Sequence, residues 1–388
     1  MPISSAINDL VPEVRTWRRE LHQNPEVMYD VEETAKFVAE RLRAFGCDEV
    51  KTAIGRTGVV GVIRGAKGSS SRSIGLRADM DALPIEEETN LPYRSKTPGK
   101  MHACGHDGHT AMLLGAAHRL AQTRDFAGNA VVIFQPAEEG GAGALAMIDD
   151  GLLDQFGVEQ VYGMHNWPGS PVGAFSIRKG PLMAAADEIT ITIEGKGGHG
   201  AMPHLGVDPI LVGAQIVTAL QTITSRNVDP LDSSVISITR FQAGTANNII
   251  PQTAWLNGTV RTLKPETRDR VEKRIHEIAA GLAEASGASA RVEYRRGYPP
   301  TINHGEQTDF AASIARKVAG DAHVDVNTPP TMGSEDFSFM LEARPGAFIF
   351  IGNGDSATLH HPSYDFNDEV LPYGISYWVE LVEMALAP

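Results

Sequence analysis

The first part of the chain alternates between helical and strand patterns of apolar residues. Apolar side chains recur at helical spacing in two early segments, at Leu10, Val14, Trp17 and Leu21, then at Phe37, Val38, Leu42 and Phe45. Short apolar runs bounded by Gly, Asp or Pro follow, and they are typical of buried strands: 57–64, 73–76, 130–134 and 160–164. Residues 108–122, rich in Ala and Leu, predict a helix between two of these runs. This alternation predicts an α/β fold whose sheet is largely parallel.

The pattern changes near residue 186. Ile189, Ile191 and Ile193 alternate with polar residues, which predicts a strand with one polar face. The following segments predict a helix at 209–225, strands at 234–241 and 253–261, a helix after 265 and a strand at 290–295. This β-α-β-β-α-β order is the ferredoxin-like arrangement. After residue 298 the earlier style returns, with a helix at 308–318, a strand at 348–352 and a final helix from 374. We therefore predict one α/β domain, residues 1–185 and 298–388, interrupted by an inserted α+β domain, residues 186–297.

Composition excludes several classes of partner. The chain has 388 residues and a formal net charge of -14, from 48 acidic and 34 basic residues. A surface of this sign repels nucleic acid and anionic lipid. The two cysteines, Cys47 and Cys104, fit a reducing compartment better than a secreted protein. The amino terminus has no signal-peptide pattern, and no apolar run approaches the roughly 18 residues of a spanning helix. We predict a cytoplasmic protein without nucleic-acid or membrane partners.

Metal-ligand side chains are concentrated at residues 102–109, with the sequence HACGHDGH. Thiolate and imidazole bind zinc and related metals, and Gly105 and Gly108 allow the backbone to turn so that neighbouring side chains converge. The alternative is a polar loop with a helix-capping Asp. The density of ligand-type residues favours a metal site, and the lack of a second Cys or His pair favours a catalytic site over a structural zinc finger.

Two further candidates follow predicted buried strands. Glu138 and Glu139 follow one strand and His165 follows the next, where α/β sheets place active residues. One carboxylate could bind metal while the other takes a proton from a water molecule. The alternatives are a solvated carboxylate pair and a histidine held by loop hydrogen bonds. The acidic run at residues 86–88 is interpreted as solvated.

Four weaker candidate groups also have an ordinary structural explanation, as residues of polar loops, turns or the surface. His360 and His361 are the only His pair after the insert, and Asp79 and Asp81 lie on one side of a strand end, where they could bind metal or hold a ligand histidine. In the insert, a glycine-rich turn at 197–204 contains His199, which could stabilise an oxyanion. The insert also contains Asn248 and Arg261, and an Arg fork suits a substrate carboxylate, although most Arg residues are surface residues.

The motifs together resemble the M20 metallopeptidases, and among them the amidohydrolase branch that includes hippurate hydrolase, N-acyl-amino-acid amidohydrolases and auxin-conjugate hydrolases. The resemblance covers nearly the whole chain. It rests on motifs in the family order: RADMDALP (77–84), HACGHDGHTA (102–111), PAEEGG (136–141), MHNWPG (164–169), GGHGAMPH (197–204), NNIIP (247–251), GSEDF (333–337) and LHHP (359–362).

The resemblance implies a role for each matching position. Cys104 would bridge two divalent metal ions, and the further ligands would be His106, Glu139, His165 and, from an H-x-P pattern, His360 rather than His361. Glu138 would be the general base, and His199 would stabilise the tetrahedral intermediate, in its own subunit or across a dimer. Asn248 and Arg261 match substrate-binding positions. Asp79 stands where other branches carry a metal-binding His and is not taken as a ligand, whereas Asp81 would support a ligand from behind. The insert would be a lid and dimerisation domain.

The implied reaction is metal-dependent hydrolysis of N-acyl amino acids, such as hippurate-like or N-acetyl substrates, by a homodimer or dimer of dimers. A mixed Cys, His and Glu set accepts two ions of Zn, Mn, Co or Ni. A narrower deacetylase, acting on N-acetyldiaminopimelate or N-acetylcysteine conjugates, would use the same motifs. An alternative from another class is a catalytically silent metal-binding scaffold, which the presence of Glu138 beside a complete ligand set disfavours.

Overall fold

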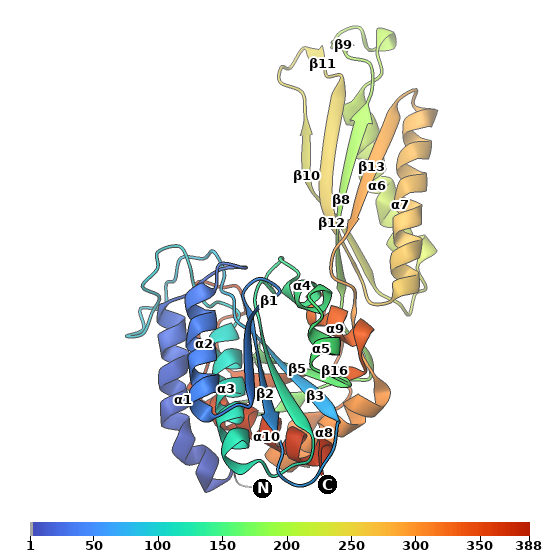
Figure 1. Ribbon diagram of the computed structural model, residues 1–388. Helices are drawn as coiled ribbons and strands as arrows, with labels where there is room; N and C mark the ends of the chain where they lie inside the picture. The colour runs from blue at the N-terminus through green and yellow to red at the C-terminus, as the bar shows by residue number, and fades with distance from the viewer. Residues whose placement is uncertain (1–2) are drawn as a thin grey trace. The chain divides into compact units, whose positions relative to one another are not determined.

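The chain folds into two compact units in the computed structural model, which describes residues 3–388. The first unit consists of the chain up to Gly180 together with Ile302–Pro329 and Asp336–Pro388, and the second consists of Pro181–Thr301 and Pro330–Glu335 (Figure 1). The second unit therefore contains the segment predicted as an insert, residues 186–297, and also a short segment from much later in the chain.

A mixed eight-stranded sheet forms the centre of the first unit. The four strands β4, β3, β5 and β16 run parallel, and antiparallel neighbours extend the sheet on both sides. The order across the sheet is β1 (Glu49–Ile54), β2 (Gly58–Arg64), β4 (Asn129–Gln135), β3 (Ser73–Asp79), β5 (Gln160–Pro168), β16 (Gly346–Gly354), β6 (Phe175–Ser176) and β15 (Val324–Asp325). Every residue of β3 is buried, as expected for a parallel strand covered on both faces. The predicted α/β fold with a mostly parallel sheet is confirmed.

Helix α3 (His106–Thr123) runs through the interior of this unit, with 14 of its 18 residues buried. It packs against α1 (Ser5–Gln23) and α10 (Leu371–Ala385), and Gly115 makes the close approach feasible, because a Cβ atom there would lie 2.8 Å from Ile375 of α10 and 3.0 Å from Val14 of α1. The helix begins two residues earlier than predicted, so His106 lies in its first turn. The other helices of the unit are α1 (Ser5–Gln23), α2 (Glu32–Phe45), α4 (Gly143–Asp149), α5 (Leu152–Gln155), α8 (Gly305–Ala319), α9 (Phe337–Ala343) and α10 (Leu371–Ala385).

The second unit is a four-stranded antiparallel sheet with two helices. Its elements follow in the order β8 (Ala185–Glu194), α6 (Pro209–Thr222), β10 (Ser234–Ala243), β12 (Thr253–Thr262), α7 (Pro265–Ala285) and β13 (Ser289–Arg296). The strand order β10-β12-β8-β13 is that of a ferredoxin-like sheet. The alternation in β8 follows the expected rule, because Ile189, Ile191 and Ile193 are fully buried while the residues between them are not.

Short elements complete the structure. Strands β9 (Gly198–His199) and β11 (Ile249–Ile250) pair to form a two-stranded ribbon, and β7 (Gly180–Met183) pairs with β14 (Thr301–Asn303). Single helical turns lie at Pro203–Leu205, Ile223–Asn227, Asp321–His323 and Asp368–Val370. Among the described helices, none has the combination of length and apolar character that crossing a membrane requires.

Candidate metal centre

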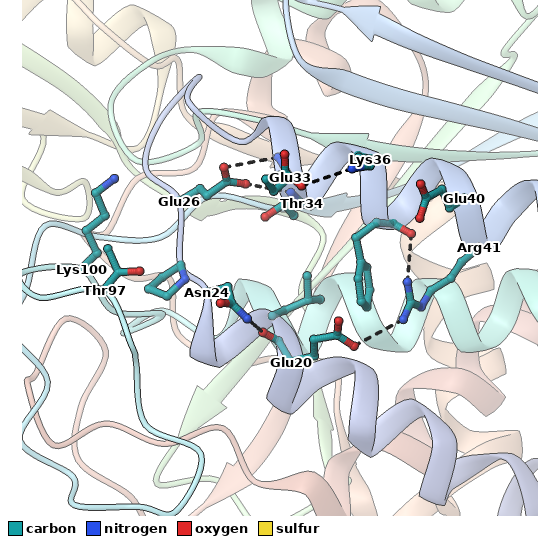
Figure 2. Close-up of a pocket in the computed structure, with 13 residues that line it drawn as sticks. Glu20, Asn24, Glu26, Glu33, Thr34, Lys36, Glu40, Arg41, Thr97 and Lys100 are labelled. Atoms are coloured by element: carbon teal, nitrogen blue, oxygen red, sulfur yellow. Dashed lines mark hydrogen bonds and ion pairs between the residues drawn. The ribbon is translucent and has the colours of Figure 1, made fainter.

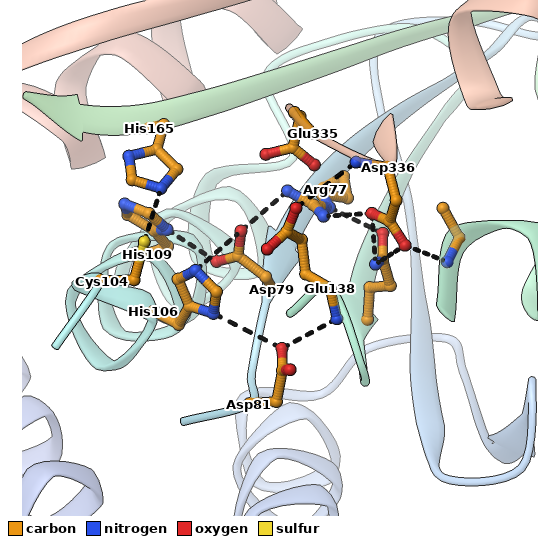
Figure 3. A network of polar contacts seen from close by, with 12 residues as sticks. Arg77, Asp79, Asp81, Cys104, His106, His109, Glu138, His165, Glu335 and Asp336 are labelled. Carbon is orange, nitrogen blue, oxygen red and sulfur yellow. Dashed lines mark hydrogen bonds and ion pairs between the residues drawn. The ribbon is translucent and has the colours of Figure 1, made fainter. Parts of the chain in front are cut away.

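The candidate residues of the first unit meet where three parallel strands and one helix have neighbouring ends. Asp79 is the last residue of β3, residues 136–141 follow β4, and His165 lies in the final part of β5, while Cys104 and His106 lie at the start of α3 (Figure 3). Because parallel strands end at the same edge of a sheet, residues far apart in sequence converge there. His165 lies inside β5 rather than after it, since pairing with Phe350 of β16 extends the strand.

Cys104, His106 and His165 form one group of potential ligands, with ligand atoms all within 4.8 Å of one another. Nε2 of His165 lies 3.3 Å from the Cys104 sulfur. Nδ1 of the same ring lies 2.7 Å from the carbonyl oxygen of Asn166, which can only accept a hydrogen bond. The proton of a neutral His165 therefore sits on Nδ1, and its Nε2 lone pair faces the sulfur.

A second group combines Cys104 with Glu139 and His360. Nε2 of His360 lies 3.2 Å from Oε1 of Glu139. The backbone of His360 has a φ of 65°, in the left-handed region, and its N–H donates to the carbonyl of Ala103. His361 is engaged elsewhere, since its Nδ1 accepts from the backbone N–H of Ser363. Of the two adjacent histidines, His360 is therefore the one placed with Cys104.

Asp81 contacts residues of both ligand groups and holds them in place. One of its carboxylate oxygens accepts the backbone N–H of Glu138 at 3.0 Å, and the other accepts that of Glu139 at 3.1 Å. The first oxygen also lies 3.4 Å from Nδ1 of His106. A single buried carboxylate thus fixes the loop that carries both glutamates and orients the ring of His106, the arrangement by which acidic residues hold ligand histidines.

Two groups of potential ligands contain the Cys104 sulfur, and the residues of these groups fit divalent cations. Nε2 of His106 is buried and has no hydrogen-bond partner among the residues described, although carboxylate oxygens of Asp79 and Glu139 lie 3.7 Å and 3.9 Å away. Burial lowers the pKa of His106, but Asp79, Asp81 and Glu139 outweigh burial and raise it to about 10. This strong negative potential stabilises a positive charge. Thiolate, imidazole and carboxylate together are a ligand set for transition metals such as zinc.

Glu138 lies beside these groups. It is 7% exposed, and its carboxylate forms a further cluster with His106 and Glu139. Its Oε1 lies 3.4 Å from the backbone N–H of Asp336. The carboxylate therefore lies next to both potential metal positions and is held through its own hydrogen bond, as a general base needs to be.

Several residues of this region received no role from the sequence. Arg77, His109 and Asp336 belong to the quoted motifs and are all buried in the same polar network (Figure 3). A signal was available for Arg77, because a charged residue inside an apolar strand needs buried partners. The interpretation of residues 86–88 as solvated was wrong for Glu87, whose side chain is 3% exposed and accepts the backbone N–H of Ser95.

The three candidates of the insert lie in the second unit. His199, in β9, pairs with Ile249 of β11, and the N–H of Gly200 donates to the carbonyl of Asn248, so His199 and Asn248 share one ribbon. Arg261 lies near the end of β12 and is half-buried, and it donates to Thr259 and to the carbonyl of Val260. The ribbon follows the opposite end of this sheet, so the structure brings His199 and Asn248 together but not Arg261.

A hollow elsewhere in the first unit contains none of the candidate residues. It has a volume of about 710 Å³ and lies between α1 and α2 (Figure 2). Its charged side chains are partly paired with one another, as in Lys36 with Glu33 and Arg41 with Glu20. Glu26 in its wall accepts the backbone N–H groups of Glu33 and Thr34 and so caps the start of α2. Because these five charged side chains have structural partners, we assign no site here.

Comparison with known proteins gives the family. The profile of Peptidase family M20/M25/M40 matches residues 75–384. The chain is 45% identical to hippurate hydrolase of Campylobacter jejuni over 98% of both chains, and 43% identical to N-acetyl-L-cysteine deacetylase of Bacillus subtilis over 91% of this chain and 83% of that protein. The fold is similar to that of the Bacillus subtilis YXEP protein, described as a dinuclear metal binding peptidase from the M20 family, with a TM-score of 0.87 and 36% identity over 98% of this chain and 99% of that one. The chain belongs to Peptidase family M20/M25/M40 and is a hydrolase of this family.

Proposed function

We propose that this protein is a metal-dependent amidohydrolase that splits N-acyl amino acids into a carboxylic acid and a free amino acid. The observation behind the proposal is that two potential ligand groups share the Cys104 sulfur, with the Glu138 carboxylate beside them. The names of the relatives, hippurate hydrolase and N-acetyl-L-cysteine deacetylase, give the class of substrate. The proposed ligands are Cys104, His106, Glu139, His165 and His360.

Two bound divalent cations, of Zn, Mn, Co or Ni, would polarise the substrate carbonyl and make water more acidic. Glu138 takes a proton from the attacking water as its oxygen bonds to the carbonyl carbon. When the C–N bond breaks, Glu138 returns that proton to the leaving nitrogen, so the carboxylate is regenerated. Asp81 keeps the loop of Glu138 in place through two backbone N–H groups.

The second unit supplies the remaining proposed roles. His199 would donate a hydrogen bond to the developing oxyanion, and Asn248 and Arg261 would bind the substrate. His199 and Asn248 are themselves exposed, which suits residues that meet a ligand. The unit would act as a lid, so a change in its position would gate turnover.

The test is a hydrolysis screen of benzoyl, acetyl and indole-acetyl amino acids in the presence of added Mn, Co or Zn. We expect release of the free amino acid with at least one acyl group, and Glu138→Gln should abolish release while retaining bound metal. Loss of metal together with activity in this variant would contradict the role of Glu138 as base. A metal-loaded wild type that hydrolyses none of the substrates would favour a silent scaffold.

A narrower deacetylase is the second candidate, because N-acetyl-L-cysteine deacetylase is nearly as similar to the chain as hippurate hydrolase. N-acetyldiaminopimelate is another substrate of this type. The same screen separates the two functions, since a narrow deacetylase would release amino acids from acetyl substrates and leave the benzoyl and indole-acetyl substrates intact.

We further propose that the protein forms a homodimer through its second unit. Among the described residues, seven of the ten large apolar side chains that are exposed belong to this smaller unit: Met202, Leu205, Ile210, Leu211, Leu231, Phe241 and Ile249. Exposed apolar surface marks interaction sites, and its concentration in one unit supports an interface there. In analytical ultracentrifugation, Leu205→Glu with Leu211→Glu should yield monomers, whereas Met384→Glu, an equally apolar exposed site in the first unit, should not. A monomeric wild type would contradict the proposal.

Both cysteines are unpaired, in keeping with a cytoplasmic location.

A further inference from the structure

We propose that Arg77 is a positioning residue that connects the general base to the metal ligands through two separate branches of one buried network. One branch runs through Asp336 to Glu138, and the other runs through Asp79 and His109 to the strand end that carries His165 (Figure 3). The catalytic part of this inference rests on the proposed hydrolase function, whereas the metal-binding part does not.

Arg77 is a buried charged residue, and each of its three guanidinium nitrogens donates a hydrogen bond. The side chain is 1% exposed in the middle of β3, where every neighbour in the strand is buried. Its Nε donates to Gln135 at 2.8 Å, Nη1 to Asp79 at 2.8 Å and Nη2 to Asp336 at 2.9 Å. A buried ion pair often stabilises a fold no better than apolar residues of the same size. The planar fork instead fixes the directions of two carboxylates at once, which an apolar side chain cannot do.

The first branch ends on the general base. Asp336 is fully buried, and besides Arg77 its carboxylate accepts the side-chain amide of Gln135 and the backbone N–H of Ala144. The backbone N–H of Asp336 points to Oε1 of Glu138 at 3.4 Å. The carboxylate of Asp336 is thus held by several donors, and its backbone N–H contributes one hydrogen bond to the Glu138 carboxylate.

The second branch ends beside the ligand histidines. Oδ1 of Asp79 lies 2.6 Å from Nδ1 of His109, and Nε2 of His109 lies 3.0 Å from the backbone N–H of Asn166. A backbone N–H can only donate, so Nε2 is an acceptor, and the proton of His109 must be on Nδ1, where it is donated to Asp79. Both ring nitrogens are therefore occupied. His109 is not a ligand, but it holds Asn166, the residue next to His165.

The packing of the imidazole rings makes this second branch specific to the metal ligands. The centroid of the His109 ring lies 4.5 Å from that of His165 and 5.5 Å from that of His106. The ring therefore packs against two proposed ligands of one metal position, and a displacement of His109 should change the geometry of both. Residues that support metal ligands in this way typically change metal affinity by about 10- to 100-fold.

The two branches predict two different defects. Asp336→Asn should lower kcat by about 100-fold, since small displacements of a reacting group have effects of this order, with little change in KM, metal content or metal affinity. His109→Gln should lower metal affinity by about 10- to 100-fold, and saturating metal should restore most of kcat. Arg77→Met should show both defects. Metal affinity is measured by competition with a chelator, using Zn or Mn alone.

The controls separate positioning from stability. Asp187→Asn breaks another buried Arg–Asp pair, with Arg268 in the second unit, and should lower the melting temperature without changing metal affinity. Asp336→Glu and His109→Asn are used if the first variants do not fold. In the wild type, ¹⁵N NMR should show His109 as the Nδ1–H tautomer both with and without metal.

The outcomes are exclusive. The two-branch proposal is overturned if Asp336→Asn and His109→Gln lose metal affinity and kcat in the same proportion. It is also overturned if metal binding changes the protonation of either ring nitrogen of His109. If the wild type hydrolyses no substrate, the proposed function fails, yet the metal affinities still decide the network: they must fall for His109→Gln and stay unchanged for Asp336→Asn.

Discussion

Alkaline pH should weaken the contact between the end of α1 and the start of α3. His22 is buried in the last turn of α1, with Nδ1 2.8 Å from Asp107 in the first turn of α3 and Nε2 3.3 Å from Glu87. Burial lowers the pKa of His22, but Asp107 and Glu87 outweigh burial and raise it from 6.5 to about 9. A protonated His22 therefore joins two carboxylates directly beside the residues that would bind metal.

The other charged and titratable groups around His22 keep their charge in this range. Arg18, on the same helix, stays positive and opposes protonation of His22. The ring of His102 lies 6.3 Å away, and burial lowers the pKa of His102 to about 3, so it is neutral. Tyr93 has a pKa raised by burial above its ordinary value. Of the groups facing this contact, His22 is thus the one that titrates between pH 6.5 and 9.

The magnitude follows from the pKa difference. Raising a pKa from 6.5 to about 9 corresponds to about 3 kcal/mol of folding free energy. Because the folded-state pKa lies above the unfolded value, this stabilisation is fully present below pH 6.5 and is lost as the pH rises through about 9. The same contact lowers the pKa of Asp107, and since both shifts describe one interaction they are not added.

The assay compares urea unfolding of the wild type and His22→Gln from pH 6 to 9.5, with a chelator present so that metal binding does not contribute. The difference in free energy of unfolding between the two proteins should fall by about 3 kcal/mol over this range. His118→Gln is the matched control, because partial burial lowers the pKa of His118, so the difference for this variant should not fall as the pH rises. A difference for His22→Gln that is constant, or that grows with pH, would refute the reasoning.

Three further predictions concern metal and packing. Chelation should lower the melting temperature of the wild type, since a ligand at 1,000 times its dissociation constant stabilises by about 4 kcal/mol; an unchanged melting temperature would exclude tight binding. Cys104→Ser removes the sulfur common to both ligand groups, so elemental analysis should find fewer than two ions per chain, and retention of two would rule out a shared thiolate. Gly108→Ala should destabilise by about 1–3 kcal/mol in urea unfolding, because a Cβ 2.2 Å from the buried Phe366 ring outweighs the helix propensity gained; a stabilised variant would contradict this packing.

Local periodicity was sufficient to predict the main elements, but not where they end. The alternation at Ile189, Ile191 and Ile193 and the helical spacing at Val14, Trp17 and Leu21 correspond to buried faces in the structure. By contrast, β3 extends three residues beyond its predicted end because Asp79 pairs with Gln135. The two-residue strands β6 and β15 have no pattern of their own and exist only through their partners. Strand ends depend on distant neighbours, which a single segment does not reveal.

In the candidate site, too, the types of residue can be recognised from the sequence, whereas their surroundings cannot. The rule that parallel strands end at one edge predicts from the sequence that Glu138, Glu139 and His165 lie at the same edge of the sheet. Residue type alone does not distinguish the histidines of residues 102–109, which all have suitable nitrogen atoms. Context does: His109 has both nitrogens occupied, by Asp79 and by the N–H of Asn166. His102 belongs to none of the potential ligand groups.

His106 and His102 both have buried ring nitrogens without a hydrogen-bond partner among the described residues, and His106 is distinguished because its ring also lies beside Cys104 and His165. Its Nδ1 lies near Asp81, while its Nε2 is buried among anionic groups with no hydrogen-bond partner in the described part of the chain. A buried nitrogen without a partner is costly in a finished fold, so a positive ligand is the simplest way to satisfy it. Ligand-type residues can thus be found from sequence, whereas the choice among them follows from which donor atoms the surrounding network leaves available beside other potential ligands.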